Sequence, residues 1–157
     1  MDSTQFKLFK QITLDYFSKL APDDTPPTFG EPYMQFGDPV SLDYTSMVKI
    51  HGEYEGCIYI TSPVPMLEQV LKINGEPDTS ESHLADMCRE LSNVLAGNAS
   101  QAFGGNWDIS VPMSLNSTDF HTVQIPASSF IMPITWRGAE SFLVVGLMEP
   151  QKNGSEN

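Results

Sequence analysis

The chain has 157 residues, enough for one domain with a sizeable core and too few for two ordinary domains. Hydrophobic residues make up 40% of it and aromatic residues 10%, which favours a globular fold over a disordered chain. Twenty acidic against eight basic residues give a formal net charge of −12, which repels phosphate backbones and anionic lipid headgroups. We therefore expect neither nucleic acid nor a membrane as a partner.

Two further patterns concern location and catalytic chemistry. No stretch approaches the roughly 18 consecutive apolar residues that cross a bilayer, and the first ten residues lack the order of a signal peptide, so we expect a cytoplasmic protein. Cys57 and Cys88 form no CxxC pair and are expected to be buried, inert thiols. His51, His83 and His121 are scattered, so we expect no metal bound by this chain.

The first half of the chain predicts a helix, a hairpin and a second helix. Residues 4–20 have apolar side chains at helical spacing, and the proline-rich residues 21–30 end that helix as a surface linker. Residues 41–62 alternate as two strands around a turn at 51–56, which favours an antiparallel hairpin. Residues 63–73 predict a short helix that begins with proline.

The second half predicts one long helix followed by strands. Asp78 stands three residues before Glu81, which resembles a capping box with aspartate as the cap, and the helix should run to about Phe103, before Gly104 and Gly105. Strands are then expected at residues 107–113, 122–125, 129–136 and 141–148, the last two joined by a hairpin turn.

This order of elements predicts an α+β protein with a mostly antiparallel sheet, two long helices and one short helix, the helices covering one face. Hairpins, rather than helical crossovers, connect most of the strands. We expect residues 1–150 to form a single domain and the polar residues 151–157 to form a flexible tail.

The long helix has two contrasting faces at about 100° per residue. The core stripe is predicted to contain Leu84, Met87, Cys88, Leu91 and Leu95, with Asn98 and Ala102 continuing that side. The opposite side carries Asp86, Glu90, Asn93 and Gly97. One interpretation is that this side is merely the solvated face of an amphipathic helix.

A functional interpretation of the polar face is also open. Asn93 and Gly97 are weak helix formers, each costing about 0.5 to 1 kcal/mol relative to better residues inside a helix. Two such residues on one face indicate a role there. Gly97 is explained either by close helix packing or by room left for the backbone of a partner.

The segment from Asp86 to Asn98 resembles the signature helix of the chemotaxis phosphatase family that contains CheC and CheX, and is more similar to CheX. The signature is an acidic residue or serine, a glutamate four positions later and an asparagine three further on, which Asp86, Glu90 and Asn93 match. Leu91 and Gly97 also fit it. The proline that usually follows a little over twenty residues after the asparagine is absent, since Pro112 is nineteen positions after Asn93.

The resemblance implies a CheC/CheX-like α+β sandwich and a homodimer. CheC-type members carry two signature helices, whereas residues 4–20 contain no Glu-x-x-Asn, so a single active site is expected, as in CheX. Its implied substrate is a phosphorylated CheY-like receiver domain, the part of a response regulator that carries an aspartyl phosphate. That partner supplies the Mg²⁺ and a lysine, and this chain binds no cofactor.

The implied residue roles follow from this chemistry. Asn93 would aim the attacking water and Glu90 would pair with the receiver's lysine, while Asp86 and Gly97 would support the interface. The main alternative is a non-catalytic binding or adaptor domain of two-component signalling or of the flagellar motor. A structural homodimer with an inert helix face is the third possibility.

Overall fold

The computed structural model describes residues 3–149, and the predicted tail at 151–157 lies outside this range. The helices are α1 (Ser3–Leu20), α2 (Val64–Ile73), α3 (Glu81–Ala102) and the short 3₁₀ helix η1 (Ser117–Thr122). The strands are β1 (Thr28–Phe29), β2 (Tyr33–Met34), β3 (Tyr44–Gly52), β4 (Glu55–Ser62), β5 (Trp107–Ile109), β6 (Met113–Leu115), β7 (Phe130–Trp136) and β8 (Ala139–Met148). The three predicted helices are thus confirmed.

The described strands form one sheet in the order β1-β7-β8-β4-β3-β5, with β2 also paired to β7 and β6 to β3. Every one of these pairs is antiparallel. Both predicted hairpins, β3–β4 and β7–β8, are present. The β7–β8 turn places Arg137 at φ 51° and Gly138 at φ 78°, the left-handed values that a tight two-residue hairpin requires.

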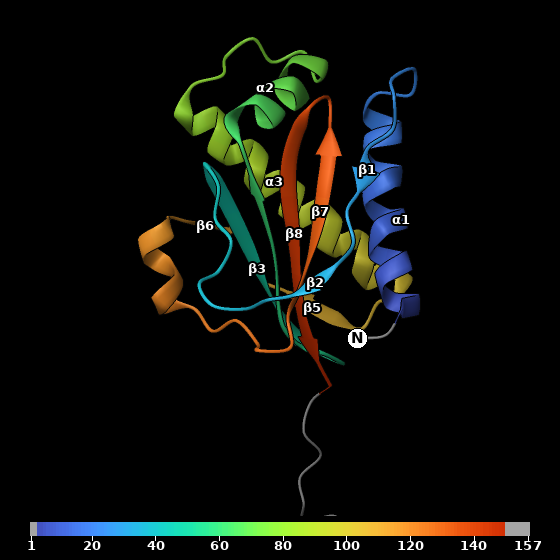
Figure 1. Ribbon diagram of the computed structural model, residues 1–157, viewed down its shortest axis with the longest axis vertical. Helices are drawn as coiled ribbons and strands as arrows, with labels where there is room; N and C mark the ends of the chain where they lie inside the picture. The colour runs from blue at the N-terminus through green and yellow to red at the C-terminus, as the bar shows by residue number, and fades with distance from the viewer. Residues whose placement is uncertain (1–2, 150–157) are drawn as a thin grey trace, which may run out of the picture.

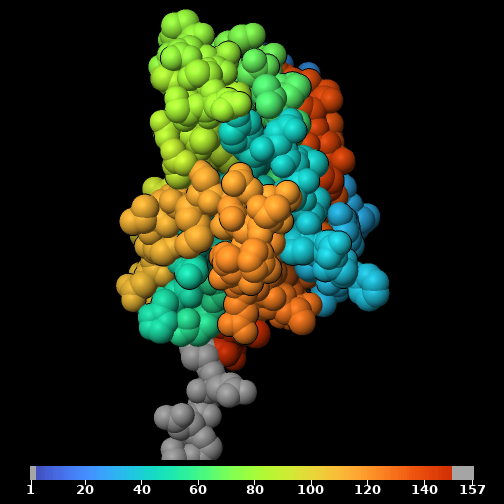
Figure 2. Space-filling view, turned by 90° about the vertical axis from the view of Figure 1, so that its left-hand side faces the viewer, coloured from blue at the N-terminus to red at the C-terminus, as the bar shows by residue number. Residues whose placement is uncertain are grey.

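The sheet separates two clusters of buried side chains. The larger cluster joins α1, α2 and α3 to one sheet face, and Figure 1 shows α3 running diagonally behind the strands, with α2 at the top of the view. The smaller cluster lies on the other face and includes Leu115 and Phe120. Figure 2 shows η1 and its flanking residues as an orange band across this part of the molecule. The expected α+β class, with the long helices on one face, is confirmed.

Three strand predictions need correction. Residues 21–30, expected to be linker alone, contain β1, because pairing with β7 orders this two-residue strand. Residues 107–113 divide into β5 and the start of β6, since the chain leaves β3 between them. Residues 122–125 are not a strand: their alternating side chains Val123 and Ile125 pack on the smaller cluster from irregular backbone.

Two details of α3 also differ from expectation. Its N-cap is Ser80 rather than Asp78, because the Asp78 carboxylate accepts a hydrogen bond from the backbone N–H of Ser80 (2.9 Å) before the helix begins. The predicted core residues Leu84, Met87, Cys88, Leu91 and Leu95 are buried. Asn98 and Ala102 are exposed, because the sheet lies under a narrower arc of the helix than the pattern predicted.

Within residues 3–149, the helices are either too short or too polar to span a bilayer.

Candidate functional site

Helix α3 is held in place by contacts on three sides. Strands β3 and β4 lie beneath it, α1 and α2 pack against it, and β5 and β6 contact it from the edge of the sheet. The apolar stripe of α3 forms its buried side. The polar side is therefore presented on a helix whose rotation and position are fixed by the core.

The predicted site residues form one ridge along α3, which we call the docking ridge: Asp86, Glu90, Asn93 and Gly97. The first three side chains are exposed and Gly97 is half-buried. With about 3.6 residues per turn, the four positions fall within an arc of about 60° and extend about 16 Å along the helix axis. The structure thus brings all four predicted residues to one surface.

Glu90 and Asn93 are adjacent on the ridge and uncommitted. Neither side chain makes a hydrogen bond or an ion pair with any residue in the described range. A carboxylate and a primary amide thus stand within one helical turn, free to contact another molecule. The amide can accept and donate a hydrogen bond at the same time.

Tyr16 of α1 lies near the Glu90 side of the ridge. Burial, and secondarily the negative charge of Glu90, raise the pKa of the Tyr16 phenol to about 12. The phenol is therefore neutral at physiological pH. Tyr16 was predicted only as part of the apolar face of the first helix, because its approach to Glu90 depends on how α1 and α3 pack.

Asp86 has a partner that the sequence analysis did not single out. Its carboxylate forms an ion pair with the guanidinium of Arg89, three residues later on α3. The same guanidinium donates a hydrogen bond to the Ser114 hydroxyl of β6. The spacing of Asp86 and Arg89 could have indicated the ion pair, whereas the link to β6 depends on the fold.

Gly97 has space around it. A Cβ atom built at this position meets nothing within 4 Å outside the helix's own backbone. Close helix packing within the described chain therefore does not explain this glycine, and the predicted packing alternative is wrong for the monomer. The open position agrees with the other alternative, that it leaves room for the backbone of a partner.

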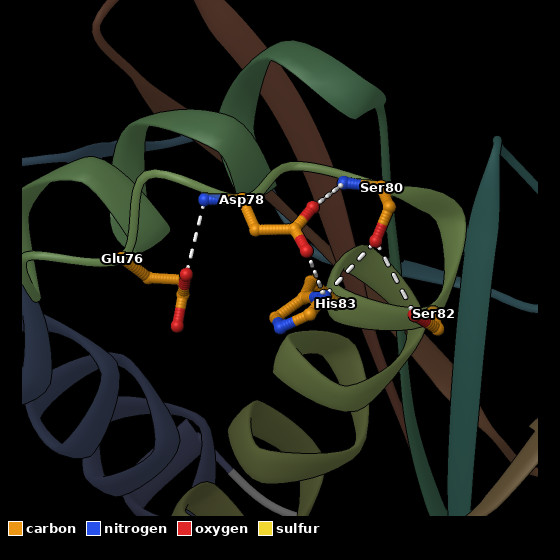
Figure 3. A network of polar contacts seen from close by, with 5 residues as sticks. All are labelled: Glu76, Asp78, Ser80, Ser82 and His83. Atoms are coloured by element: carbon orange, nitrogen blue, oxygen red, sulfur yellow. Dashed lines mark hydrogen bonds and ion pairs between the residues drawn. The ribbon is translucent and has the colours of Figure 1, made fainter.

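An open hollow adjoins the N-terminal end of the ridge, between α2 and α3. Its lining residues are Leu71, Asn74, Glu76, His83, Asp86, Met87 and Glu90. Figure 3 shows the polar network there, in which His83 Nδ1 lies 2.9 Å from Ser80 Oγ and 3.2 Å from an Asp78 carboxylate oxygen. Hydrogen bonds from Ser80 hold the pKa of Asp78 below its ordinary value. This network orders the start of the helix that carries the ridge.

The remaining chemistry-bearing residues lie away from the ridge or are shielded. Cys57 and Cys88 are buried, and burial raises the pKa of each thiol to about 12, which confirms the prediction of inert thiols. In the part of the chain that the structure describes, no three His, Cys, Asp or Glu side chains gather as a metal site would need.

Comparison with known proteins places this arrangement in a family. The model of the family described as chemotaxis phosphatase CheX matches residues 44–135, more than half of the chain and all of the docking ridge. The chain therefore belongs to the CheX family of chemotaxis phosphatases. A search of curated proteins gives no match.

Solved structures with the same fold include a chemotactic CheC-like protein from Shewanella oneidensis, 20% identical with a TM-score of 0.75, over 94% of this chain and 100% of that one. The CheX of a CheX–CheY–BeF₃–Mg²⁺ complex from Borrelia burgdorferi is 18% identical, with a TM-score of 0.70 over 92% and 98%. The FliM middle domain from Vibrio alginolyticus is more distant, 11% identical with a TM-score of 0.57 over 92% and 90%. The expected CheC/CheX-like architecture is confirmed.

Proposed function

We propose that this chain is a phosphatase that hydrolyses the aspartyl phosphate of a CheY-like receiver domain. The observation that carries the proposal is the pairing of Glu90 and Asn93, both exposed and uncommitted on a helix anchored by its buried face. Membership of the CheX family and the Borrelia CheX–CheY complex support a CheY-like receiver as the partner.

Asn93 acts on the attacking water. Hydrolysis of a phosphoryl group by in-line attack needs little covalent chemistry from the protein, so positioning and charge supply most of the acceleration. The Asn93 amide oxygen accepts a hydrogen bond from the water while its NH₂ group donates to a neighbouring oxygen. Insertion of this side chain beside the phosphoryl group therefore aims the water along the line of attack.

Glu90 orients the docked ridge. Its carboxylate pairs with the active-site lysine of the receiver, a charge-assisted contact that fixes the helix relative to the phosphoryl group. The Mg²⁺ that neutralises developing charge belongs to the receiver, as in the Borrelia complex, which contains Mg²⁺ and BeF₃. This chain contributes a water-positioning amide and an orienting carboxylate.

The rest of the ridge supports the interface. Gly97 lets the receiver backbone approach α3, and Asp86 lies one turn before Glu90. Both this chain and, typically, receiver domains are acidic, so long-range steering is unfavourable and we expect a weak, transient complex. We also propose a homodimer with one ridge per chain, which light scattering coupled to size-exclusion chromatography tests directly.

The proposal is tested by phosphate release from phosphorylated receiver domains of the same organism, in Mg²⁺, with wild type and Asn93→Ala in parallel. Acceleration by wild type but not by the variant identifies the substrate and supports the water-positioning role. Absence of acceleration for every receiver, with folded protein, contradicts phosphatase activity.

A non-catalytic adaptor is the second candidate, and the structural similarity to the FliM middle domain favours it, though at 11% identity that likeness concerns the fold alone. In that case the ridge is a recognition surface. The two candidates differ in turnover: an adaptor binds its partner without changing the lifetime of the aspartyl phosphate.

A further inference from the structure

Arg89 is the single basic residue of α3, in a chain with a net charge of −12. Its side chain is 35% exposed and lies beside the docking ridge. The guanidinium has two partners from different elements, the Asp86 carboxylate on its own helix and the Ser114 hydroxyl on β6. A planar guanidinium can satisfy both at once, so its position is more restricted than that of an isolated surface cation.

The ridge carries two carboxylates that differ in their surroundings. Asp86 and Glu90 are four residues apart, one above the other on the helix and about 6 Å apart along its axis. Asp86 is ion-paired with Arg89, whereas Glu90 makes no ion pair with any residue from 3 to 149. The ridge therefore offers a docking cation one uncompensated carboxylate.

This difference matters because two equal carboxylates would define two docking registers. A receiver lysine on Glu90 brings Asn93 to the phosphoryl group. A lysine on Asp86 shifts the helix by about one turn and carries the Asn93 amide out of reach. Both registers bind the receiver, and only the first hydrolyses its phosphate.

We infer that Arg89 is a positioning residue that selects the productive register by occupying Asp86 and leaving Glu90 as the lysine's partner. The inference rests on the proposed function and deepens it, because it assigns the choice of register to a residue outside the Glu-x-x-Asn pair. Ser114 contributes by holding the guanidinium in place from β6. Arg89 contacts neither substrate nor water in this account.

The kinetic consequence is specific. When Arg89→Gln frees Asp86, a larger share of complexes forms in the unproductive register. Unproductive binding lowers kcat and KM by the same factor and leaves kcat/KM unchanged, whereas distortion of the helix lowers kcat/KM. Because exposed ion pairs are weak, the expected decrease in each constant is up to about fivefold.

The test is a double-mutant cycle on receiver dephosphorylation with Arg89→Gln, Asp86→Asn and the double variant. We expect kcat and KM to fall together in Arg89→Gln and to return to wild-type values in the double variant, which lacks the competing carboxylate. The matched control is Arg137→Gln, because Arg137 is also 35% exposed and ion-paired, but with Asp24 near the β7–β8 turn. This control should leave both constants unchanged.

A second readout does not depend on turnover. With the BeF₃-bound receiver and Mn²⁺ in place of Mg²⁺, the NMR signal of the Asn93 side-chain amide should broaden strongly in the wild-type complex. It should broaden less in Arg89→Gln and strongly again in the double variant. A wild type that binds without turnover contradicts the proposed function, and this readout still decides the register.

Three results would overturn the inference. One is an unchanged kcat in Arg89→Gln. Another is a fall in kcat/KM that Asp86→Asn does not reverse, which would show Arg89 to be merely structural. The third is equal Mn²⁺ broadening in wild type and Arg89→Gln. Failure of every receiver to bind overturns the inference together with the proposed function.

Discussion

The hydroxyl oxygen of Ser92 on α3 lies 2.8 Å from that of Ser46 on β3, in the buried interface between helix and sheet. Ser92 also donates a hydrogen bond to the carbonyl oxygen of Arg89 (2.9 Å). In the sequence Ser92 stands between Glu90 and Asn93. The hydrogen bond therefore fixes the rotation of the helix at the turn that presents the two proposed functional side chains.

This serine pair predicts an asymmetric effect on stability. Ser92→Ala leaves the buried Ser46 hydroxyl without its partner and should lower the free energy of unfolding by about 1 to 3 kcal/mol. Ser46→Ala should cost about 0.5 to 1.5 kcal/mol, because Ser92 retains its bond to the Arg89 carbonyl. Urea unfolding measures both values. Equal costs, or a larger cost for Ser46→Ala, would contradict this account of the pair.

Gly97→Ala should separate stability from function. Because a Cβ atom at this position meets open space, alanine should stabilise α3 by up to about 1 kcal/mol. The same methyl group should weaken receiver binding, if the receiver backbone approaches there. Thermal unfolding and titration calorimetry measure the two effects. A variant that is more stable and binds normally would remove Gly97 from the interface.

Gly56 provides the matched control for that experiment. It has φ 147°, and a Cβ atom there would lie 1.8 Å from the Gly146 carbonyl oxygen on the neighbouring strand. Gly56→Ala should therefore destabilise the sheet strongly. Opposite signs for the two glycine substitutions would show that one glycine serves the fold and the other serves the surface.

Glu90→Lys should weaken docking more than it slows chemistry. The new ammonium group opposes the receiver's lysine, so the dissociation constant should rise by about tenfold or more, while Glu90→Gln should have a smaller effect. Titration calorimetry with a BeF₃-bound receiver measures both constants. Wild-type affinity in Glu90→Lys would refute the proposed pairing with lysine.

The buried thiols predict a loss of stability at alkaline pH. Burial raises the pKa of Cys57 and Cys88 from 9.0 to about 12, so the unfolded chain loses these protons at a lower pH than the folded chain. Their contribution is complete below pH 9 and is lost as pH rises towards 12. The urea midpoint should therefore fall between pH 8 and pH 10. The double variant Cys57→Ala, Cys88→Ala should show a shallower fall, and an identical slope would exclude the thiols as the cause.

The sequence predicted the elements whose signals are local. The helical periodicity before Leu20 and the alternation around the β3–β4 turn depend on neighbouring residues, and both predictions are confirmed. The two-residue strands β1 and β2 have no such signal, because only pairing with β7 orders them. At Thr122 the alternating pattern was misleading, since the chain there ends a 3₁₀ helix that begins with a capping box between Asn116 and Asp119.

The candidate site divides in the same way. Glu90 and Asn93 belong to one helix, so their spacing was enough to place them on one exposed face. Ser92, Tyr16 and Arg89 were not singled out, because their roles depend on β3, α1 and β6. Sequence spacing thus predicted the proposed functional pair, and the fold revealed the residues around it.

The central claim is that Asn93 aims water rather than binding the receiver, and the direct test compares kcat with the dissociation constant for Asn93→Ala on one receiver. We predict that kcat falls by orders of magnitude, while the dissociation constant for the BeF₃-bound receiver changes by less than about threefold. Equal losses of turnover and binding would contradict the water-positioning role and would identify Asn93 as a docking residue.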